Sequence, residues 1–346
     1  MSAALELAFA GRQVTVFERQ QAMSESSWAA AGMLAATDPE NPPALRPLAE
    51  LSGTLYPQFL ERIAQLSGHA ISIRTTRTLQ GAATLPRGTS EVDSATLDML
   101  APGIEHQGLR FFLLDEMSVN PRDLVEALPR AVRAAGVALH EQCPVLRVRE
   151  DKDAVELTTP QGEWVAGVLI HATGAWAGKL TGIPTTPRKG QMVEVYLPGR
   201  QQLDVVLRTP EIYLVPRGEG RIVIGATVED AGFDKHVDGI VLDGLMETAA
   251  RLWPPIREAR IVDSWAGLRP AGPDDLPVID SLTNCRGSVS ADLREPRSWV
   301  AAGHFRNGIL LAPATALLLR QMILGEPLSA DPSAFRCDRF AFSSVQ

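Results

Sequence analysis

The sequence predicts an α/β protein, of mixed α/β and α+β type, with two domains. One is a Rossmann-like nucleotide-binding domain without its first strand and glycine-rich loop, and the other carries an antiparallel sheet. Three observations predict this fold: a helix and strand typical of a nucleotide-binding unit within residues 1–18, three strand-like runs within residues 190–228, and a strand, loop and helix within residues 298–323. The length of 346 residues also exceeds the usual size of one domain.

The N-terminal residues predict the second half of a nucleotide-binding βαβ unit. Ser2–Ala10 has one apolar face, Gly11 suits the end of a helix, and Val14–Phe17 is a short strand that ends at Glu18. An acidic residue at this position binds ribose hydroxyls about 20 residues after a G-x-G-x-x-G turn. Counting back from Glu18 places that turn just before Met1. We therefore expect the given sequence to start after the turn, and we favour a truncated gene over a variant fold.

The middle of the chain predicts a second domain inserted into the first. A small-residue segment at 24–36 precedes a proline-rich stretch at 39–47, which suits a link between domains, and residues 48–66 follow a helical pattern. The expected nucleotide-binding domain comprises residues 1–45, 115–186 and 260–346, and the expected second, substrate-binding domain comprises residues 46–114 and 187–259.

Further elements follow from turn residues and apolar periodicity. Asn120 and Pro121 predict the start of a helix that ends near Gly136, and Pro129 within it predicts a kink or a break. Beyond it we expect strands at 137–140, 155–157, 164–166, 168–172, 192–197, 212–216, 222–226 and 298–302, then a loop at 303–311 and a helix at 313–323.

Composition excludes several classes of protein. A net charge of −8 and a pI near 5.4 argue against a nucleic-acid partner, which clustered Lys and Arg would bind. No uninterrupted apolar run approaches the ~20 residues of a membrane-spanning helix and no signal pattern is present, so we expect a cytoplasmic protein. Cys143, Cys285 and Cys337 are far apart and include no C-x-x-C, which predicts reduced thiols, no disulfide framework and no metal site.

Four segments are candidates for a cofactor site. Glu18 suits ribose hydroxyls, with a solvated strand end as the alternative; the small residues of 26–33 admit a pyrophosphate or a ring against the backbone, with close helix packing as the alternative. Thr173 and Gly174 follow a strand end, where open α/β sheets bind ligands. The segment 301–310, AAGHFRNGIL, predicts backbone N–H groups and a positive helix end facing an electron-rich ligand.

Arg269 is the candidate for holding a substrate carboxylate. It lies in the apolar segment WAGLRP, and a guanidinium binds a carboxylate through two parallel hydrogen bonds. The alternative is a structural ion pair with Asp263 or Asp275. Tyr213 lies in a predicted strand from which its hydroxyl could reach the same carboxylate, or it is an ordinary half-buried tyrosine. His304 is expected to be a packed loop residue and not a base.

The motifs AAAGML, ATGAW, YLVPR, IGAT, WAGLRP and AGHFRNGILLAPAT together resemble the glycine oxidases of thiamine biosynthesis (ThiO type), within the D-amino-acid oxidase superfamily. The resemblance covers nearly the whole chain, with an expected insertion around 285–297. It implies non-covalently bound FAD, a small amino-acid substrate, dioxygen as the acceptor and hydrogen peroxide as the product. It also implies a homo-oligomer.

The resemblance also implies the roles of individual residues. Arg269 would bind the substrate carboxylate, with Tyr213 and Arg306 beside it, and Val228 stands where some relatives have a methionine near the substrate. The residues implied to contact the cofactor, together with Thr173 and Gly174, are Glu18, Arg19, Ser26, Ser27, Ala31, Gly32, Met33, Val145, His304, Phe305, Arg306, Asn307, Gly308, Ile309 and Leu310.

The sequence thus predicts oxidation of glycine, or of another small amine or D-amino acid, by hydride transfer to FAD, with no acid or base assigned. Two alternatives stay open. One is a D-amino-acid or sarcosine dehydrogenase that uses an acceptor other than oxygen. The other is an inactive remnant that binds amino acids or a partner without redox chemistry.

Overall fold

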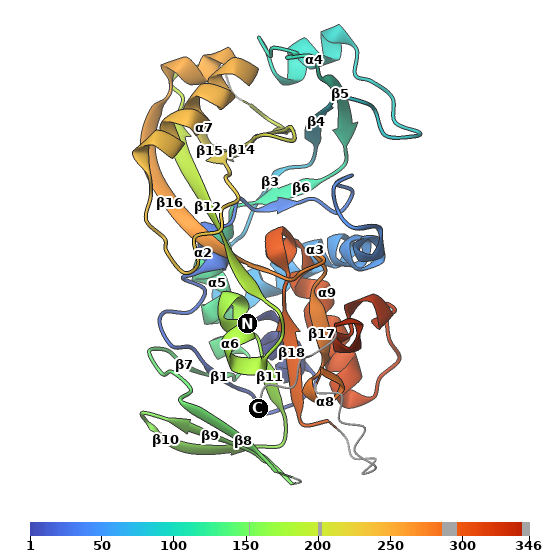
Figure 1. Ribbon diagram of the computed structural model, residues 1–346, viewed down its shortest axis with the longest axis vertical. Helices are drawn as coiled ribbons and strands as arrows, with labels where there is room; N and C mark the ends of the chain where they lie inside the picture. The colour runs from blue at the N-terminus through green and yellow to red at the C-terminus, as the bar shows by residue number, and fades with distance from the viewer. Residues whose placement is uncertain (152, 200–202, 286–295, 341–346) are drawn as a thin grey trace.

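A computed structural model describes residues 1–151, 153–199, 203–285 and 296–340. Figure 1 shows an elongated molecule with a large sheet and helix α7 at one end and several small sheets at the other. The expected insertion around 285–297 lies mostly outside the described residues. The helices are α1 (Ser2–Phe9), α2 (Ser26–Ala29), α3 (Arg46–Ser67), α4 (Ser94–Leu100), α5 (Pro121–Ala134), α6 (Ala177–Thr181), α7 (Gly239–Leu252), α8 (Leu282–Cys285) and α9 (Gly308–Leu324).

The strands form five sheets. They are β1 (Thr15–Phe17), β2 (Met33–Leu34), β3 (Ile73–Thr75), β4 (Thr78–Ala82), β5 (Arg110–Leu114), β6 (Met117–Val119), β7 (Ala138–His140), β8 (Arg147–Glu150), β9 (Val155–Thr159), β10 (Gly162–Ala166), β11 (Leu169–His171), β12 (Thr186–Tyr196), β13 (Val206–Arg208), β14 (Tyr213–Gly218), β15 (Arg221–Gly225), β16 (Arg260–Ala271), β17 (Val278–Ser281) and β18 (Ser298–Ala302). Short 3-10 turns, among them η2 (Gly174–Trp176), η4 (Phe305–Asn307) and η6 (Cys337–Arg339), lie between them.

The nucleotide-binding part contains parallel strands, as the sequence predicts. β1 pairs in parallel with β7, and β11 pairs in parallel with β18, whose other neighbour is the antiparallel strand β17. Helices α1, α3, α5 and α9 pack around these strands in one hydrophobic core. Asn120 caps α5 by accepting a hydrogen bond from the Arg122 amide. Of the kink or break expected at Pro129, a break does not occur, because α5 continues through Pro129 to Ala134.

The second part is a seven-stranded sheet in the order β16-β12-β15-β14-β13-β4-β5. Neighbouring strands are antiparallel except for the parallel pair of β13 and β4. The three strand runs expected within 190–228 all belong to this sheet. Its alternating apolar residues form a second core with α4 and α7.

Two elements lie in a different core from the one that the predicted domain bounds would give. Helix α3, placed by the sequence in the substrate-binding domain, packs against α5 and α9 in the first core, because its buried residues such as Leu48 and Ile63 face those helices. Strand β16, placed by the sequence in the nucleotide-binding domain, is the edge of the large sheet and pairs with β12 over its whole length.

Helix α9 begins at Gly308, although the sequence predicted a loop up to 311 and a helix start at Pro313. Pro313 inside the helix provides no N–H for the carbonyl of Ile309. The hydroxyl of Tyr56 on α3 donates to that carbonyl at 2.6 Å. Ser52 on α3 donates to the Leu310 carbonyl at 2.6 Å and accepts from the Ala314 amide at 3.2 Å. Because α3 satisfies these groups, the helix extends one turn further towards its N-terminus.

Tyr56→Phe tests this arrangement. The substitution leaves the half-buried Ile309 carbonyl without its partner, and we expect the free energy of unfolding to fall by about 1–2 kcal/mol, as measured by urea denaturation. Tyr196→Phe is the matched control, because the Tyr196 hydroxyl makes no hydrogen bond within the described part of the chain, and its effect should stay below about 0.5 kcal/mol. Equal effects of the two substitutions would contradict the role of Tyr56.

The prediction of three reduced thiols is wrong. Cys285, at the end of α8, and Cys337, at the start of η6, form a disulfide with their Cα atoms 4.6 Å apart. Both segments are fixed by Asp280 at the end of β17, whose carboxylate accepts from the side chain of Asn284 and from the amide of Cys337. This packing brings together cysteines that are 52 residues apart in the chain. Cys143 is free and buried.

One segment of the described residues, Phe305–Leu324, is long and apolar enough to cross a membrane, with a mean hydropathy of 1.4. The sequence expectation of no such run overlooked it, because Arg306, Asn307 and Arg320 interrupt it. It is η4 with α9, and 56% of its most apolar window is buried inside the protein against α1 and α3. Burial in the first core therefore accounts for its composition.

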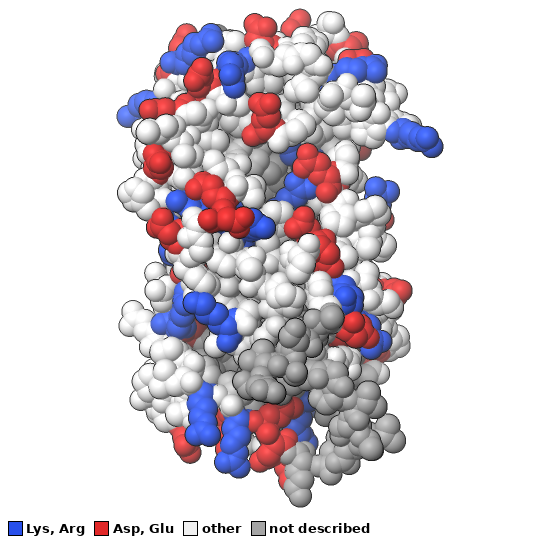
Figure 2. All heavy atoms as spheres, viewed as in Figure 1, with Lys and Arg blue, Asp and Glu red and all other residues white. Residues whose placement is uncertain are grey.

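Charged residues of both signs are mixed over the surface. Figure 2 shows acidic and basic side chains interspersed over one face, with no wide area of basic residues alone. Within the described residues, no group of three or more His, Cys, Asp or Glu side chains is arranged to hold a metal ion.

Candidate functional site

A cavity of about 1990 Å³ runs between the nucleotide-binding part and the large sheet. Strands β1 and β11, helix α2, the turn after β11 and the segment before α9 line one side of it, and residues of β14, β15 and β16 line the other. Every candidate residue named from the sequence lines this cavity except Leu310. Leu310 is fully buried in the first core, because α9 begins earlier than expected and turns this side chain towards α3.

The guanidinium of Arg269 lies flat across the large sheet. Arg269 is on β16, and Nη1 donates to the carbonyl of Thr227 at 3.0 Å. A Cβ atom built on Gly190 of the neighbouring strand β12 would lie 2.2 Å from this Nη1. A side chain at position 190 would thus displace the guanidinium, so the glycine is required for its position.

Arg269 forms no ion pair among the described residues, which argues against the structural alternative. Asp263, one of the two suggested partners, instead binds Arg122 at 2.9 Å. Tyr213 lies beside Arg269, and its ring packs over Gly225, where a Cβ would be 2.6 Å from the hydroxyl. Burial raises the pKa of Tyr213, while the nearby Arg269 acts in the opposite direction. Tyr213 is therefore a proton donor at neutral pH, beside a guanidinium with unused donors.

Arg306 is already paired within the protein. Nη1 donates to Glu40 at 2.7 Å and Nη2 lies 3.6 Å from Asp38. Arg306 still lines the cavity, but these two carboxylates neutralise much of its charge. Asp38 is also 3.6 Å from the buried Arg208, so this end of the cavity is a network of opposite charges. Of the two arginines predicted near the substrate, Arg269 is the one with no carboxylate beside it in the described residues.

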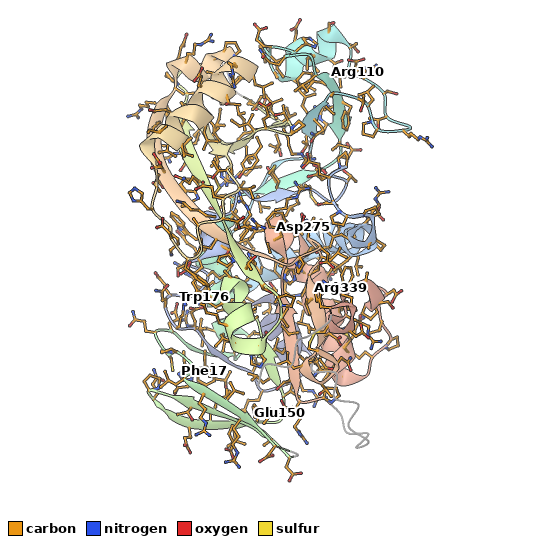
Figure 3. The ribbon with its side chains drawn as sticks, viewed as in Figure 1. Phe17, Arg110, Glu150, Trp176, Asp275 and Arg339 are labelled. Carbon is orange, nitrogen blue, oxygen red and sulfur yellow. A yellow bond between two sulfur atoms is a disulfide. The ribbon has the colours of Figure 1, made fainter. Side chains whose placement is uncertain are left out.

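Glu18 and Arg19 follow β1 at the far end of the cavity. The Glu18 amide donates to the His140 carbonyl, which extends the pairing of β1 with β7, and its carboxylate accepts from the Gln20 amide at 3.0 Å. The guanidinium of Arg19 lies 3.6 Å from the ring centroid of Trp176 in η2. Figure 3 shows Trp176 beside α6, between the long strands of the large sheet and Phe17 of β1. Phe233 stacks on this Trp176 ring.

The small-residue segment around α2 both lines the cavity and packs closely on its neighbours, so both interpretations of this segment hold. Ser26, Ser27, Ala31, Gly32 and Met33 line the cavity. Gly32 also has a packing role, because its φ is +83° and a Cβ there would lie 2.1 Å from the Val119 carbonyl. Close packing on β6 and exposure of the backbone to the cavity therefore coexist in one segment.

The turn after β11 presents an unsatisfied polar atom. Thr173 follows β11, and its buried hydroxyl has no hydrogen-bond partner among the described residues although the residue lines the cavity. Buried polar atoms without partners are rare in folded proteins. A ligand bound at this strand end would provide the missing partner. This agrees with the prediction that Thr173 and Gly174 contact a cofactor.

The segment before α9 directs a helix N-terminus into the cavity. His304, Phe305, Asn307, Gly308 and Ile309 line it, and α9 starts at Gly308 without a side-chain cap on its first amides. The Asn307 side chain donates instead to Asn41 at 3.0 Å. The positive end of the helix dipole favours an electron-rich ligand here.

The comparisons with known proteins agree with this geometry. The profile of the family described as "FAD dependent oxidoreductase" matches residues 1–322. The chain belongs to this family. It is 32% identical to the glycine oxidase of Pseudomonas putida, over 96% of the chain and 93% of that protein. It is 34% identical to the bifunctional protein ThiO/ThiG of Synechocystis sp., over 95% of the chain, and spans about half of that protein.

A solved structure of glycine oxidase from Geobacillus kaustophilus has the same fold. It superposes with a TM-score of 0.89 at 28% sequence identity and covers 98% of this chain and 95% of that one. The resemblance drawn from the six sequence motifs is therefore confirmed. This chain is an FAD-dependent oxidoreductase with the mixed α/β architecture of its relatives.

The residues of this oxidoreductase fit FAD. The cavity is long enough to extend from Glu18 to Arg269, the Thr173 hydroxyl lacks a partner, and the first amides of α9 are uncapped. Val145 lies near the Glu18 end and also lines the cavity. Which of these residues contact the cofactor stays a prediction.

Sequence reasoning missed several residues of the site. The role of Gly190 could have been predicted, since a lone glycine within a strand indicates a close approach of another group. The role of the Thr227 carbonyl could not have been predicted, because any residue provides a backbone acceptor. The pairing of Arg306 with Asp38 and Glu40 was also not foreseeable, because β2 and η4 are brought together only by packing.

His304 is held neutral, which agrees with its expected role as a packed residue. It is buried, Nε2 lies 3.0 Å from the Thr315 hydroxyl on α9, and burial lowers its pKa to about 4. A histidine with this pKa is uncharged at neutral pH and is a weak base.

The lowered pKa of His304 makes stability depend on pH. Between pH 6.5 and about 4 the unfolded state binds a proton that the folded state does not, so stability should fall as the pH falls through this range, by up to about 1.4 kcal/mol per pH unit. Urea denaturation at several pH values should show a shallower dependence for His304→Gln than for the parent protein. Exchange of the exposed His236 for Gln is the control, and the same flattening in both variants would contradict the assignment.

Proposed function

We propose that this enzyme oxidises glycine, and other small amines or D-amino acids, to the imine with dioxygen as the electron acceptor, in support of thiamine thiazole synthesis. One observation carries the proposal: a guanidinium without a carboxylate partner, Arg269, lies in the cofactor cavity beside a protonated tyrosine hydroxyl. This pair suits the carboxylate of an amino acid. The names of the relatives, glycine oxidase and ThiO/ThiG, support the same substrate class and pathway.

Binding through the carboxylate orients the substrate. Two parallel hydrogen bonds from Arg269 fix the plane of the carboxylate, and Tyr213 donates a third, so that the α-carbon is held in one position in the cavity. The ring of Tyr213 and the apolar side chain of Met192 exclude water from this end. Arg306, neutralised by Glu40 and Asp38, is proposed to shape the opposite wall.

Bound FAD would supply the oxidising power, by accepting the hydride of the α-carbon and transferring two electrons to oxygen. The substrate amine must be neutral for its lone pair to form the C=N bond as the hydride leaves. His304 is uncharged at neutral pH and is engaged with Thr315, so it adds no positive charge to the cavity. Hydrolysis of the imine of glycine gives glyoxylate and ammonia, and oxygen is reduced to hydrogen peroxide.

The holoenzyme, reconstituted with FAD and supplied with glycine in air, tests the proposed function. We expect one hydrogen peroxide for each glyoxylate formed. Reduction of an artificial electron acceptor without oxygen, and no peroxide in air, would instead identify a dehydrogenase of D-amino acids or sarcosine. If the protein binds FAD but is inactive in both assays, small amino acids and amines are excluded as its substrates.

Arg269→Ala should raise the KM for glycine about 100-fold, because it removes two charge-assisted hydrogen bonds. Gly190→Ala should also raise KM, since the added methyl group would overlap the guanidinium. Arg188→Ala is the matched control: Arg188 lies opposite Arg269 in the β12–β16 ladder, pairs with Asp230 and does not line the cavity. Steady-state kinetics measure all three, and an unchanged KM in Arg269→Ala removes this residue from the substrate site.

A further inference from the structure

A second pocket, of about 310 Å³, lies behind the cofactor cavity at the start of α5. It is bordered by the outer end of β14, the turn that follows and strand β15, together with the Trp265 side of β16. Four arginines line it, from four separate segments of the chain. The lining residues are Ala30, Arg74, Asn120, Arg122, Glu194, Arg217, Gly218, Glu219, Arg221, Val223 and Trp265.

Three of these arginines have carboxylate partners. Arg74 binds Asp123 at 2.9 Å, Arg122 binds Asp263 at 2.9 Å, and Arg221 binds Glu194 at 3.1 Å. Glu194 is shared, because Arg122 also lies 3.4 Å from it. The acidic side chains at the pocket are therefore largely engaged, with Glu219 exposed at its rim.

Arg217 differs from the other three. It donates to two backbone carbonyls, of Val119 at 2.8 Å and Ala30 at 3.4 Å, and no carboxylate of the described residues lies within 4 Å of it. Arg217 is half-buried, and desolvation of its guanidinium lowers its pKa to about 10 although Glu194 acts in the opposite direction. A guanidinium has five N–H donors, so several remain for another acceptor. A buried cation without a counter-charge is unfavourable, and folded proteins normally pair it.

The surroundings of Arg217 favour an anion as this counter-charge. Three of the four arginines that line the pocket are held by carboxylates, which leaves Arg217 as the one with no carboxylate of the described residues within 4 Å. The positive end of the 14-residue helix α5 also opens here, with Asn120 as its cap. A tetrahedral dianion accepts hydrogen bonds from several guanidinium groups at once, which a single carboxylate does less well.

We infer that this pocket is a binding site for a phosphate group, centred on Arg217 with Arg221 and Arg122 around it. The volume accommodates inorganic phosphate or the phosphate of a small ester. Arg217 also contacts the Ala30 carbonyl, next to the α2 segment that lines the cofactor cavity, so the site lies directly behind that cavity. It is independent of the proposed amine oxidation.

Inorganic phosphate added to the FAD-loaded protein tests this site. We expect saturable binding by isothermal titration calorimetry and a rise in the thermal midpoint that sodium chloride at equal ionic strength does not give. A phosphomonoester such as phosphoserine, titrated in parallel, identifies the source of the phosphate by its relative affinity.

Arg217→Met should weaken phosphate binding at least tenfold, and Arg149→Met, an exposed arginine on β8, should leave it unchanged. If Arg217→Met does not fold, Arg221→Met replaces it in the test and should also weaken phosphate binding. This variant is expected to fold, because the Arg221 side chain is 51% exposed and Glu194 keeps Arg122 as a partner. A midpoint shift equal to that of chloride, or full binding in the folded variants, overturns the proposal.

Discussion

The contact between strand β16 and the segment around α2 joins the nucleotide-binding part to the large sheet. The Ser26 hydroxyl donates to the Leu268 carbonyl at 2.6 Å, and the Trp265 indole donates to the Ala29 carbonyl at 2.9 Å. Gly267 lies between these bonds, and a Cβ there would be 2.5 Å from the Cβ of Ala29. Arg269 follows on the same strand, so this contact fixes the position of the Arg269 guanidinium relative to the α2 segment.

Proline in helix α9 is tolerated because another helix replaces the hydrogen bonds that it removes. Tyr56 and Ser52 of α3 bind the carbonyls that Pro313 disrupts, and the same contacts anchor α9 in the first core. The uncapped amides at Gly308 are thereby held at the cavity. A change in the core far from the substrate should consequently alter the position of this helix end, although no atom of Tyr56 or Ser52 carries out chemistry.

Charge is distributed differently around the arginines of the cavity. Arg306 and Arg208 lie among Asp38, Glu40 and Glu116, and burial raises the pKa of Glu116 despite the arginine beside it. Arg269 has only a backbone carbonyl and Tyr213 beside it. A carboxylate in the cavity would therefore meet less negative charge at Arg269 than at Arg306 and Arg208, in line with the proposed orientation of the substrate.

The sequence by itself determined the class of fold, half of the eighteen described strands and nearly all of the named residues that line the cavity, because apolar periodicity, turn residues and local motifs are properties of short segments. It also determined the family, through six motifs. Only the tertiary structure decided that Arg269 is free and Arg306 is paired, that Leu310 lies in the core, that Cys285 meets Cys337, and that α3 belongs to the first core. Each of these depends on segments distant in the chain, which are brought together by packing that no local pattern encodes.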